Sequence, residues 1–266
     1  MKRIEKFGIV FCMIIGVGLS FWTEQKAISH LCNRQYEEAF IKNEKNEQLV
    51  MLVEEENKRE QKVAYLTFDD GPSVYTPQVL DILNKYGIHA TFFLIGENVD
   101  DKMLPIIERT VKEGNLVGIH TYSHRAEKIY GSCEAFQKDV QMAKAVIENA
   151  IHEKVRFYRF PWGSANGYLR PISKHVIPWL QEQGITYCDW NVSGEDSIGK
   201  CSEWSIYHNV EKDMGRFKQS FILLHDSKSC CLTVSALPQI IEDALAKGYR
   251  FDTIDHAPNV YQCCLE

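Results

Sequence analysis

The sequence predicts an α/β protein built as a (β/α) barrel, complete or incomplete, and three observations lead to this fold class. From Val63 onward, short runs of β-branched and aromatic residues alternate with segments of helical periodicity, which is the pattern of repeated β-α units. About seven strand candidates can be counted, close to the number that a barrel needs. The chain has 266 residues, of which 45% are hydrophobic, so it can bury one sizeable core.

The strand candidates share a short apolar run bounded by polar or turn residues: 63–68, 90–95, 116–120, 157–160, 185–190, 221–225 and 250–254. Helices are expected between them, over 102–112, 134–151, 169–183 and 233–247, with a first helix that has Thr76 as its N-cap and Pro77 as its first helical residue. In barrels of this kind, chemistry gathers at the C-terminal ends of the strands.

The N-terminal part of the chain has a different composition. Basic residues precede an apolar run over 7–22, which indicates a signal peptide or an uncleaved signal anchor over residues 1–23. No small-x-small cleavage pattern follows the run, which favours the anchor, and either form implies action outside the cytoplasm. Residues 24–61 are interpreted as a charged, partly helical linker, either a membrane-tethering stalk or a solvated helix packed on the domain. The main domain is expected over 62–256, with a C-terminal tail over 257–266.

The net charge limits the classes of partner. A formal net charge of -6 gives no basic field for nucleic acid or anionic lipid, so we expect no nucleic-acid partner and membrane contact only through the N-terminal segment. We expect a monomer with a neutral or weakly charged partner.

The nine cysteines contain no C-x-x-C spacing; disulfides formed after export and free buried thiols are both compatible with them.

Two aspartates stand together at the end of the first expected strand, in the segment T-F-D-D-G-P over 67–72. Neighbours on a strand point to opposite sides, but at a turn Asp69 and Asp70 can reach one site with different roles. One carboxylate can bind a metal while the other acts as a base. Alone, the segment could equally be an ordinary surface turn.

Two histidines follow the third expected strand, in the segment H-T-Y-S-H over 120–124. The four-residue spacing brings His120 and His124 to one side of a helical turn or tight loop, as a metal site needs. With one aspartate they provide three ligands and leave positions open for water and substrate, which is typical of a catalytic zinc. Histidines in a polar loop are otherwise usually just exposed.

Two further strand ends carry candidate residues. The segment R-F-P-W-G over 159–163 places Arg159 and an aromatic residue at a sharp turn, and L-L-H-D over 223–226 places His225 at the end of an apolar strand. Singly, Arg159 could be an ordinary ion-pair partner and His225 a satisfied core histidine. Four such motifs in one chain, each at a strand end, favour a common site.

In this ordered set of motifs the sequence resembles the polysaccharide deacetylase family, also called carbohydrate esterase family 4 or the NodB-homology domain, from about Val63 to about Ile254. The resemblance implies a distorted (β/α) barrel that hydrolyses N-acetyl or O-acetyl groups on polysaccharides. It implies one divalent metal, expected to be zinc with cobalt, nickel or manganese as alternatives, held by Asp70, His120 and His124. The D-W-N-V-S-G-x-D wording over 189–196 is similar to bacterial cell-wall deacetylases, which favours peptidoglycan as the substrate.

The same resemblance implies roles for the remaining motif residues. Asp69 is expected to be the catalytic base, Arg159 the residue that orients it, and His225 the general acid. A protonated histidine suits amide hydrolysis, because an unprotonated amine is a poor leaving group. The backbone N–H of Trp162 is expected to stabilise the oxyanion. The expected substrate-binding residues lie in or beside these motifs: Trp162, Pro161, Tyr122 and Leu223.

The chain also departs from the family's pattern. Many members carry an aspartate four residues ahead of a tryptophan before the last motif, where this chain has Ser193 and Ser197. Asp196 and Asp189 are both candidates for the charge that tunes the histidine acid. Phe160 and Trp162 are bulkier than the residues usual at their positions, which predicts a narrower groove.

Three other functions remain open at the level of sequence. An O-acetyl esterase for a plant or capsular polysaccharide could use the same centre. Two histidines and one carboxylate also suit a non-haem Fe(II) oxygenase, although no cosubstrate site is evident. A wall-binding protein with an inactive centre is the third, and the presence of every proposed site residue argues against it.

Overall fold

The computed structural model describes residues 42–43, 45–46, 49, 51 and 61–263. The chain divides into two compact units, Met1–Asn57 and Lys58–Glu266, and only isolated helical residues of the first are described. The expected signal segment 1–23 and nearly all of the linker 24–61 therefore lie outside the described residues. Among the residues that are described, no helix has the length and apolar character that a membrane crossing requires.

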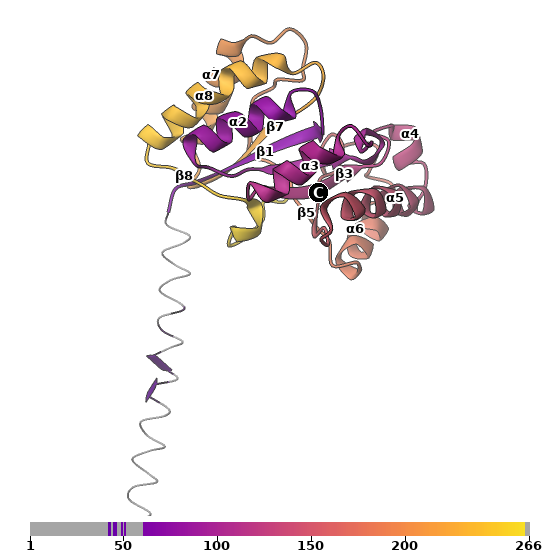
Figure 1. Cartoon of the computed structure of the whole chain (residues 1–266). Helices are drawn as coiled ribbons and strands as arrows, with labels where there is room; N and C mark the ends of the chain where they lie inside the picture. The colour runs from indigo at the N-terminus through magenta and orange to yellow at the C-terminus, as the bar shows by residue number, and fades with distance from the viewer. Residues whose placement is uncertain (1–41, 44, 47–48, 50, 52–60, 264–266) are drawn as a thin grey trace, which may run out of the picture. The chain divides into compact units, whose positions relative to one another are not determined.

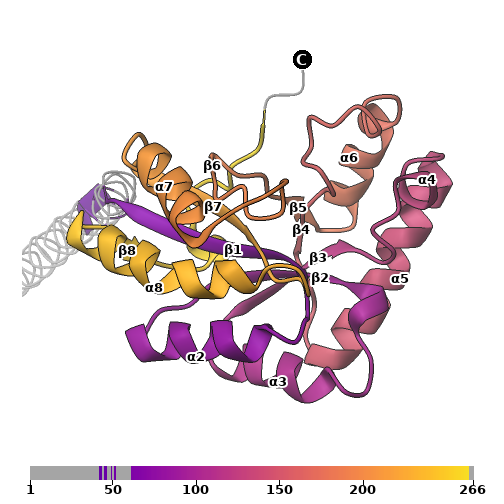
Figure 2. The same cartoon turned by 90° about the horizontal axis from the view of Figure 1, so that it is seen from above.

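The second unit is built on one parallel sheet with the strand order β5-β4-β3-β2-β1-β7-β6, and β8 pairs with the beginning of β1 (Figure 2). The strands are β1 (Val63–Gly71), β2 (Thr91–Ile95), β3 (Leu116–Thr121), β4 (Phe157–Tyr158), β5 (Thr186–Tyr187), β6 (Val192–Ser193), β7 (Gln219–His225) and β8 (Arg250–Phe251). No pairing joins β5 to β6 within the described part of the chain, so the curled sheet is an incomplete barrel. The predicted fold class is confirmed.

Helices form an outer layer around this sheet (Figures 1 and 2). They are α2 (Thr76–Tyr86), α3 (Leu104–Lys112), α4 (Ala126–Ile129), α5 (Cys133–Ile151), α6 (Ser173–Glu182), α7 (Glu203–Met214) and α8 (Cys231–Ala246), with short 3₁₀ turns η1 (Gly96–Asn98) and η2 (Ile254–His256). Successive neighbours in space are α7, α8, α2, α3, α5 and α6, so the layer follows the curl of the sheet.

The core has two parts because the central strands are buried on both faces. Along β1, Ala64, Leu66 and Phe68 face the helices and join the larger cluster, whereas Val63 and Tyr65 face inward and join a smaller one. Residues 257–263, which the sequence suggested as a tail, contact the inner side: Val260 and Tyr261 pack on the smaller cluster, and the Tyr261 carbonyl accepts the Asp189 N–H at 2.8 Å.

The structure differs from the sequence prediction at several elements. Strand β6 and helices α4 and α7 were not expected, and α6 begins at Ser173 rather than Leu169. The N-cap of α2 is Tyr75, and Thr76 is the first helical residue. The Thr76 hydroxyl does not cap the helix because it is occupied in the site described below, where it donates to Asp226 at 2.5 Å.

Candidate active site

The adjacent carboxylates Asp69 and Asp70 reach one pocket because β1 is irregular at its end. The register between β1 and β2 shifts between Asp69 and Gly71, and Asp70 has a φ of 72°, in the left-handed region. A regular strand would send the two side chains to opposite faces. Left-handed backbone at a non-glycine residue costs energy and persists only where the surroundings enforce it, which is common at functional sites.

Asp226, at the end of β7, holds this turn in place. Its N–H donates to the Asp69 carbonyl at 2.7 Å, and its carboxylate accepts from the Ser73 hydroxyl at 2.6 Å and from Thr76. Position 71 suits glycine, since a Cβ there would lie 2.8 Å from Asp226 Oδ2 and would force the carboxylate or the turn to shift. The turn after β1 and the end of β7 are therefore built as one unit.

The two histidines come from the end of β3 and the loop that follows it. His120 is 3% exposed, and its Nδ1–H donates to the Arg159 carbonyl at 2.8 Å, which directs Nε2 toward Asp70. His124 lies in the loop with a φ of 50°. Burial, followed by the nearby charge of His120, lowers the pKa of His124, so the neutral imidazole that a metal requires is favoured.

Asp70, His120 and His124 fit a single metal ion. Nε2 of each histidine lies 3.5 Å from Asp70 Oδ1, and the three ligand atoms all lie within 4.8 Å of one another. Tetrahedral zinc with bonds near 2.1 Å would place its ligand atoms about 3.4 Å apart. Asp70 Oδ1 is also buried without a hydrogen-bond partner in the described residues, which is costly unless a cation binds there.

Asp69 is fixed beside this group by a buried arginine. Arg159 is fully buried; its Nη1 donates to Asp69 Oδ1 at 3.0 Å and to the Thr67 hydroxyl at 2.6 Å, and its Nε donates to the Cys188 carbonyl at 2.9 Å. Oδ2 of Asp69 remains on the side of the metal group, 3.9 Å from His120 Nε2. One oxygen of Asp69 is thus held in place while the other faces the reaction site.

His225 faces the pocket from the end of β7 and is paired with Asp196. Its Nδ1 lies 2.8 Å from Asp196 Oδ1, and its backbone N–H donates to Asp196 Oδ2 at 2.8 Å. Burial alone would lower the pKa of His225, but the hydrogen bond and charge of Asp196, with smaller contributions from Asp69 and Asp70, raise the pKa to about 9. The imidazole of His225 is therefore protonated at neutral pH.

The sequence left two aspartates, Asp196 and Asp189, as candidates for the charge beside His225, and the structure places Asp196 there. Of the two candidates, Asp196 contacts His225, whereas Asp189 accepts from Ser164 and from the Cys263 N–H. Asp196 lies 29 residues before His225 in the chain, and Thr233 donates to its second oxygen at 2.7 Å. In the sequence, Asp196 is the last residue of the segment D-W-N-V-S-G-x-D. The segment indicated an aspartate at this position, but the sequence did not indicate which residue the aspartate contacts.

A pocket of about 590 Å³ joins these groups. Its lining comes from several strand ends and the loops after them: Asp69, Asp70, His120, His124, Trp162, Trp190, Ser193, Glu195, Ser197, Ile198, Leu223 and His225. The Trp162 ring is 49% exposed and lies 4.9 Å from the His124 ring. Trp162 has a φ of 64°, and its N–H meets no acceptor among the described residues, so this donor is free for a ligand.

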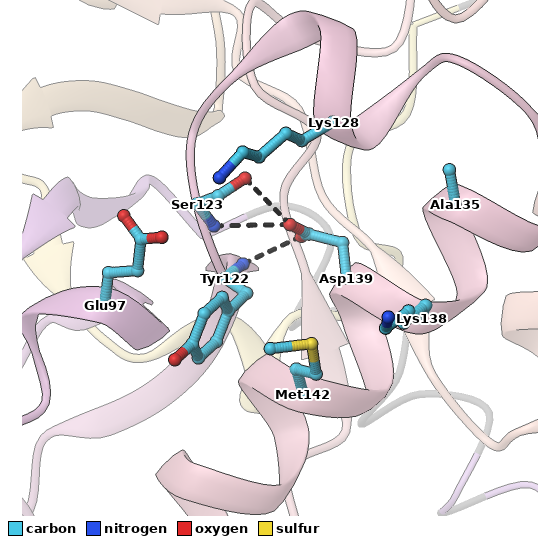
Figure 3. Close-up of a pocket in the computed structure, with 8 residues that line it drawn as sticks. All are labelled: Glu97, Tyr122, Ser123, Lys128, Ala135, Lys138, Asp139 and Met142. Atoms are coloured by element: carbon cyan, nitrogen blue, oxygen red, sulfur yellow. Dashed lines mark hydrogen bonds between the residues drawn. The ribbon is translucent and has the colours of Figure 1, made fainter.

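Three expectations about the pocket wall need correction. Tyr122 does not line this pocket: its ring lies against Gly96 and borders a separate pocket (Figure 3). Pro161 is buried, and its carbonyl accepts from the Tyr130 hydroxyl at 3.2 Å. Phe160 is fully buried among Tyr158 and other aromatic rings, so it cannot narrow the groove. Residues 159–161 are all buried, and of this segment only Trp162 lines the pocket.

Comparisons with known proteins agree with this geometry. The family model described as "Polysaccharide deacetylase" matches residues 56–177. A peptidoglycan-N-acetylglucosamine deacetylase of Bacillus cereus is 34% identical over 74% of this chain and 70% of its own length. A bifunctional xylanase/deacetylase of Pseudobutyrivibrio xylanivorans is 36% identical over 74% of this chain, which spans only 31% of that relative.

Solved structures give the same result. The catalytic domain of a peptidoglycan N-acetylglucosamine deacetylase from Eubacterium rectale superposes with a TM-score of 0.72 at 33% identity, over 77% of this chain and 94% of that one. The family model and the two relatives thus match in sequence, and the sheet with its outer helices has the fold of that catalytic domain. The chain belongs to the polysaccharide deacetylase family.

Proposed function

We propose that this protein is a metal-dependent hydrolase that removes N-acetyl groups from amino sugars of peptidoglycan. The observation that carries the proposal is the convergence of Asp70, His120 and His124 on one point, with Asp69 on one side and the charged His225 in the same pocket. The membership of the family and the peptidoglycan substrates named for its relatives support the choice of reaction and of polymer.

In this proposal Asp70, His120 and His124 hold the metal, which when bound supplies Lewis-acid activation of water and of the acetyl carbonyl. Asp69 accepts the proton of the attacking water at Oδ2, while Arg159 holds Oδ1. The free Trp162 N–H donates to the oxygen on which negative charge develops. His225 then gives its Nε2 proton to the leaving nitrogen as the carbon–nitrogen bond breaks, so acetate and a free amine are released.

The ion pair between His225 and Asp196 supports an amide rather than an ester as the substrate. An amine leaves only when it is protonated, whereas an alkoxide needs less help. A histidine whose pKa is raised to about 9 keeps its proton throughout the neutral range. The site is therefore suited to the more demanding of the two leaving groups.

Hollows on two sides of the metal group support a polymeric substrate. A second pocket of about 370 Å³ shares Asp70 and His124 with the main pocket and continues past Asn98 to Lys228. A sugar ring at the metal group would thus have room for neighbours in both directions. This arrangement suits attack within a glycan chain.

We further propose zinc as the metal, and the same three ligands could also bind cobalt, nickel or manganese. The cell-wall substrates of the relatives support action outside the cytoplasm, either as a membrane-anchored or as a secreted protein. A monomer is sufficient, because every proposed site residue comes from one chain.

The test is to incubate the zinc-loaded protein with purified peptidoglycan and with N-acetylglucosamine oligomers, and to locate new free amines by mass spectrometry. We expect amines on N-acetylglucosamine residues, accompanied by equimolar acetate. Acetate release from acetylated xylan without any new amine would instead identify an O-acetyl esterase. This is the second candidate function, and the similarity to the xylanase/deacetylase supports it. No release from any substrate would contradict the proposed activity, and metal-dependent oxygen consumption would indicate an oxygenase.

A further inference from the structure

The loop between the two histidines needs support from outside itself. Residues 121–124 connect the end of β3 to the segment before α4, and His124 has the left-handed φ that an unsupported loop would avoid. His120 is fixed separately, by its place in β3 and by its bond to the Arg159 carbonyl. The position of His124 therefore depends on whatever holds the loop.

Asp139 of α5 supplies most of that support (Figure 3). Its Oδ1 accepts from the Thr121 hydroxyl at 2.5 Å and from the Tyr122 N–H at 2.8 Å. Its Oδ2 accepts from the Ser123 hydroxyl at 3.0 Å and from the Ser123 N–H at 3.2 Å. The Thr121 hydroxyl in turn accepts the His124 N–H at 3.4 Å, so the support reaches the second histidine.

The carboxylate is itself rigidly placed. Asp139 is 6% exposed and stands between Phe136 and Val140, which are buried in the core, on a 19-residue helix that Ser132 caps. No cation lies within ion-pair distance of Asp139 in the described part of the chain. Its two oxygens instead accept four hydrogen bonds, the number that a carboxylate can take.

We infer that Asp139 is a positioning residue that holds His124 at ligand distance and so sets the affinity of the metal site. This inference rests on the proposed function, because it presumes that Asp70, His120 and His124 bind a metal. Hydrogen bonds that orient metal ligands from outside the coordination sphere typically change metal affinity by about 10- to 100-fold when they are removed. An asparagine cannot replace the aspartate, because its amide group would face donors of the loop.

The test compares zinc affinity in the full chain with Asp139→Asn. We expect the zinc dissociation constant to rise by about 10- to 100-fold, with the circular dichroism spectrum unchanged. Saturating zinc should restore most of kcat, because Asp69 and His225 are untouched. Glu148→Gln is the matched control, because it removes another carboxylate from the same helix. The Glu148 carboxylate accepts the Val155 N–H at 3.0 Å and does not contact the loop, so this variant should leave zinc affinity unchanged.

Ser123→Ala removes a single bond to Asp139 and should raise the dissociation constant by a smaller factor, which keeps the test open if Asp139→Asn does not fold. Wild-type zinc affinity in both Asp139→Asn and Ser123→Ala, or an equal loss in Glu148→Gln, would overturn the inference while leaving the proposed function intact. Absence of zinc binding in the wild-type protein would overturn both.

Discussion

At the scale of single residues, the charge state of His225 is the property on which its proposed role as the proton donor depends. Its two ring nitrogens have separate tasks: Nδ1 is held by Asp196, and Nε2 faces the pocket, 3.3 Å from the Ser197 hydroxyl. Because its pKa is raised to about 9, the histidine is charged in the folded protein over a pH range in which an ordinary histidine is neutral.

Asp196→Asn should remove that charge stabilisation. Since the folded-state pKa lies above the ordinary value of 6.5, the wild-type pair stabilises the fold fully below pH 6.5 and loses this contribution as pH rises toward about 9. We expect wild-type kcat to fall above about pH 9, and the variant's alkaline limb to move toward pH 6.5. Profiles of kcat and thermal unfolding against pH measure both effects. Identical alkaline limbs would show that Asp196 does not set the protonation of His225.

Trp162 offers a separation of side-chain and backbone roles. Its exposed ring borders the pocket, while its N–H is the proposed oxyanion donor. Trp162→Ala removes the ring and keeps the N–H, so we expect KM for N-acetylglucosamine oligomers to rise by about tenfold while kcat changes little. Steady-state kinetics with an oligomer of four N-acetylglucosamine units as the substrate check this. A large fall in kcat at unchanged KM would instead indicate that the ring supports the turn.

At the scale of elements, the turn after β1 is restrained by several contacts and backbone features. Asp70 adopts left-handed backbone, Gly71 leaves no room for a side chain, and Asp226 ties the turn to β7. These restraints bring the proposed base and the proposed metal ligand to one side of the strand.

Gly71→Ala should disturb this turn specifically. The new Cβ would lie 2.8 Å from Asp226 Oδ2, so the carboxylate or the turn must shift, at a cost of about 1 to 3 kcal/mol in the free energy of unfolding. We also expect lower zinc affinity, because Asp70 moves with the turn. Gly167→Ala is the control, since nothing lies within 4 Å of a Cβ there. Thermal unfolding and zinc titration of both variants decide the matter, and equal behaviour would refute a special role for Gly71.

The elements that could be predicted from sequence are those with a strong local pattern. The strands from Val63, Ala90 and Leu116 have long apolar runs, and α5 and α8 have several turns of apolar periodicity. Strand β6 has two residues, too few for any alternation to show. Helix α7 buries only Ile206, Val210 and Met214, a stripe too narrow to stand out in a polar segment.

The site was predictable to the extent that it lies at strand ends. Four residues lie within the last three positions of their strands, and the structure brings them together: Asp69, Asp70, His120 and His225. Asp196 and Asp139 could not be placed, because their contacts depend on how a loop and a helix pack against distant strands. Tyr122 was misplaced for the same reason, since side-chain direction in a loop does not follow from sequence spacing.

At the scale of the whole molecule, catalysis and stability are coupled through the proposed ion. The proposed ligands come from β1, from β3 and from the loop after β3, and β2 lies between these two strands in the sheet, so a metal there would link the ends of β1 and β3. In the described residues the cysteines at positions 133, 188, 201, 230, 231 and 263 are free, so no disulfide provides such a link within that part of the chain.

Removal of the metal should therefore lower stability as well as activity. Zinc at about 100 times its dissociation constant contributes about 2.7 kcal/mol to the free energy of unfolding, which corresponds to about 5 to 10 °C in Tm for a domain of this size. A chelator should abolish acetate release and lower Tm by that amount, and added zinc should restore both. Calorimetry with and without chelator measures the shift. An unchanged Tm would indicate that no ion binds the folded site.

The most direct test of the account compares metal content and acetate release in the wild-type protein, Asp69→Asn and His124→Ala. We predict one bound zinc per wild-type chain. Asp69→Asn should keep the zinc but lose turnover by about 100- to 10,000-fold, because only the base is removed. His124→Ala should lose zinc and turnover together. Wild-type turnover in either variant, or full zinc content in His124→Ala, would contradict the assignment of the metal ligands and the base.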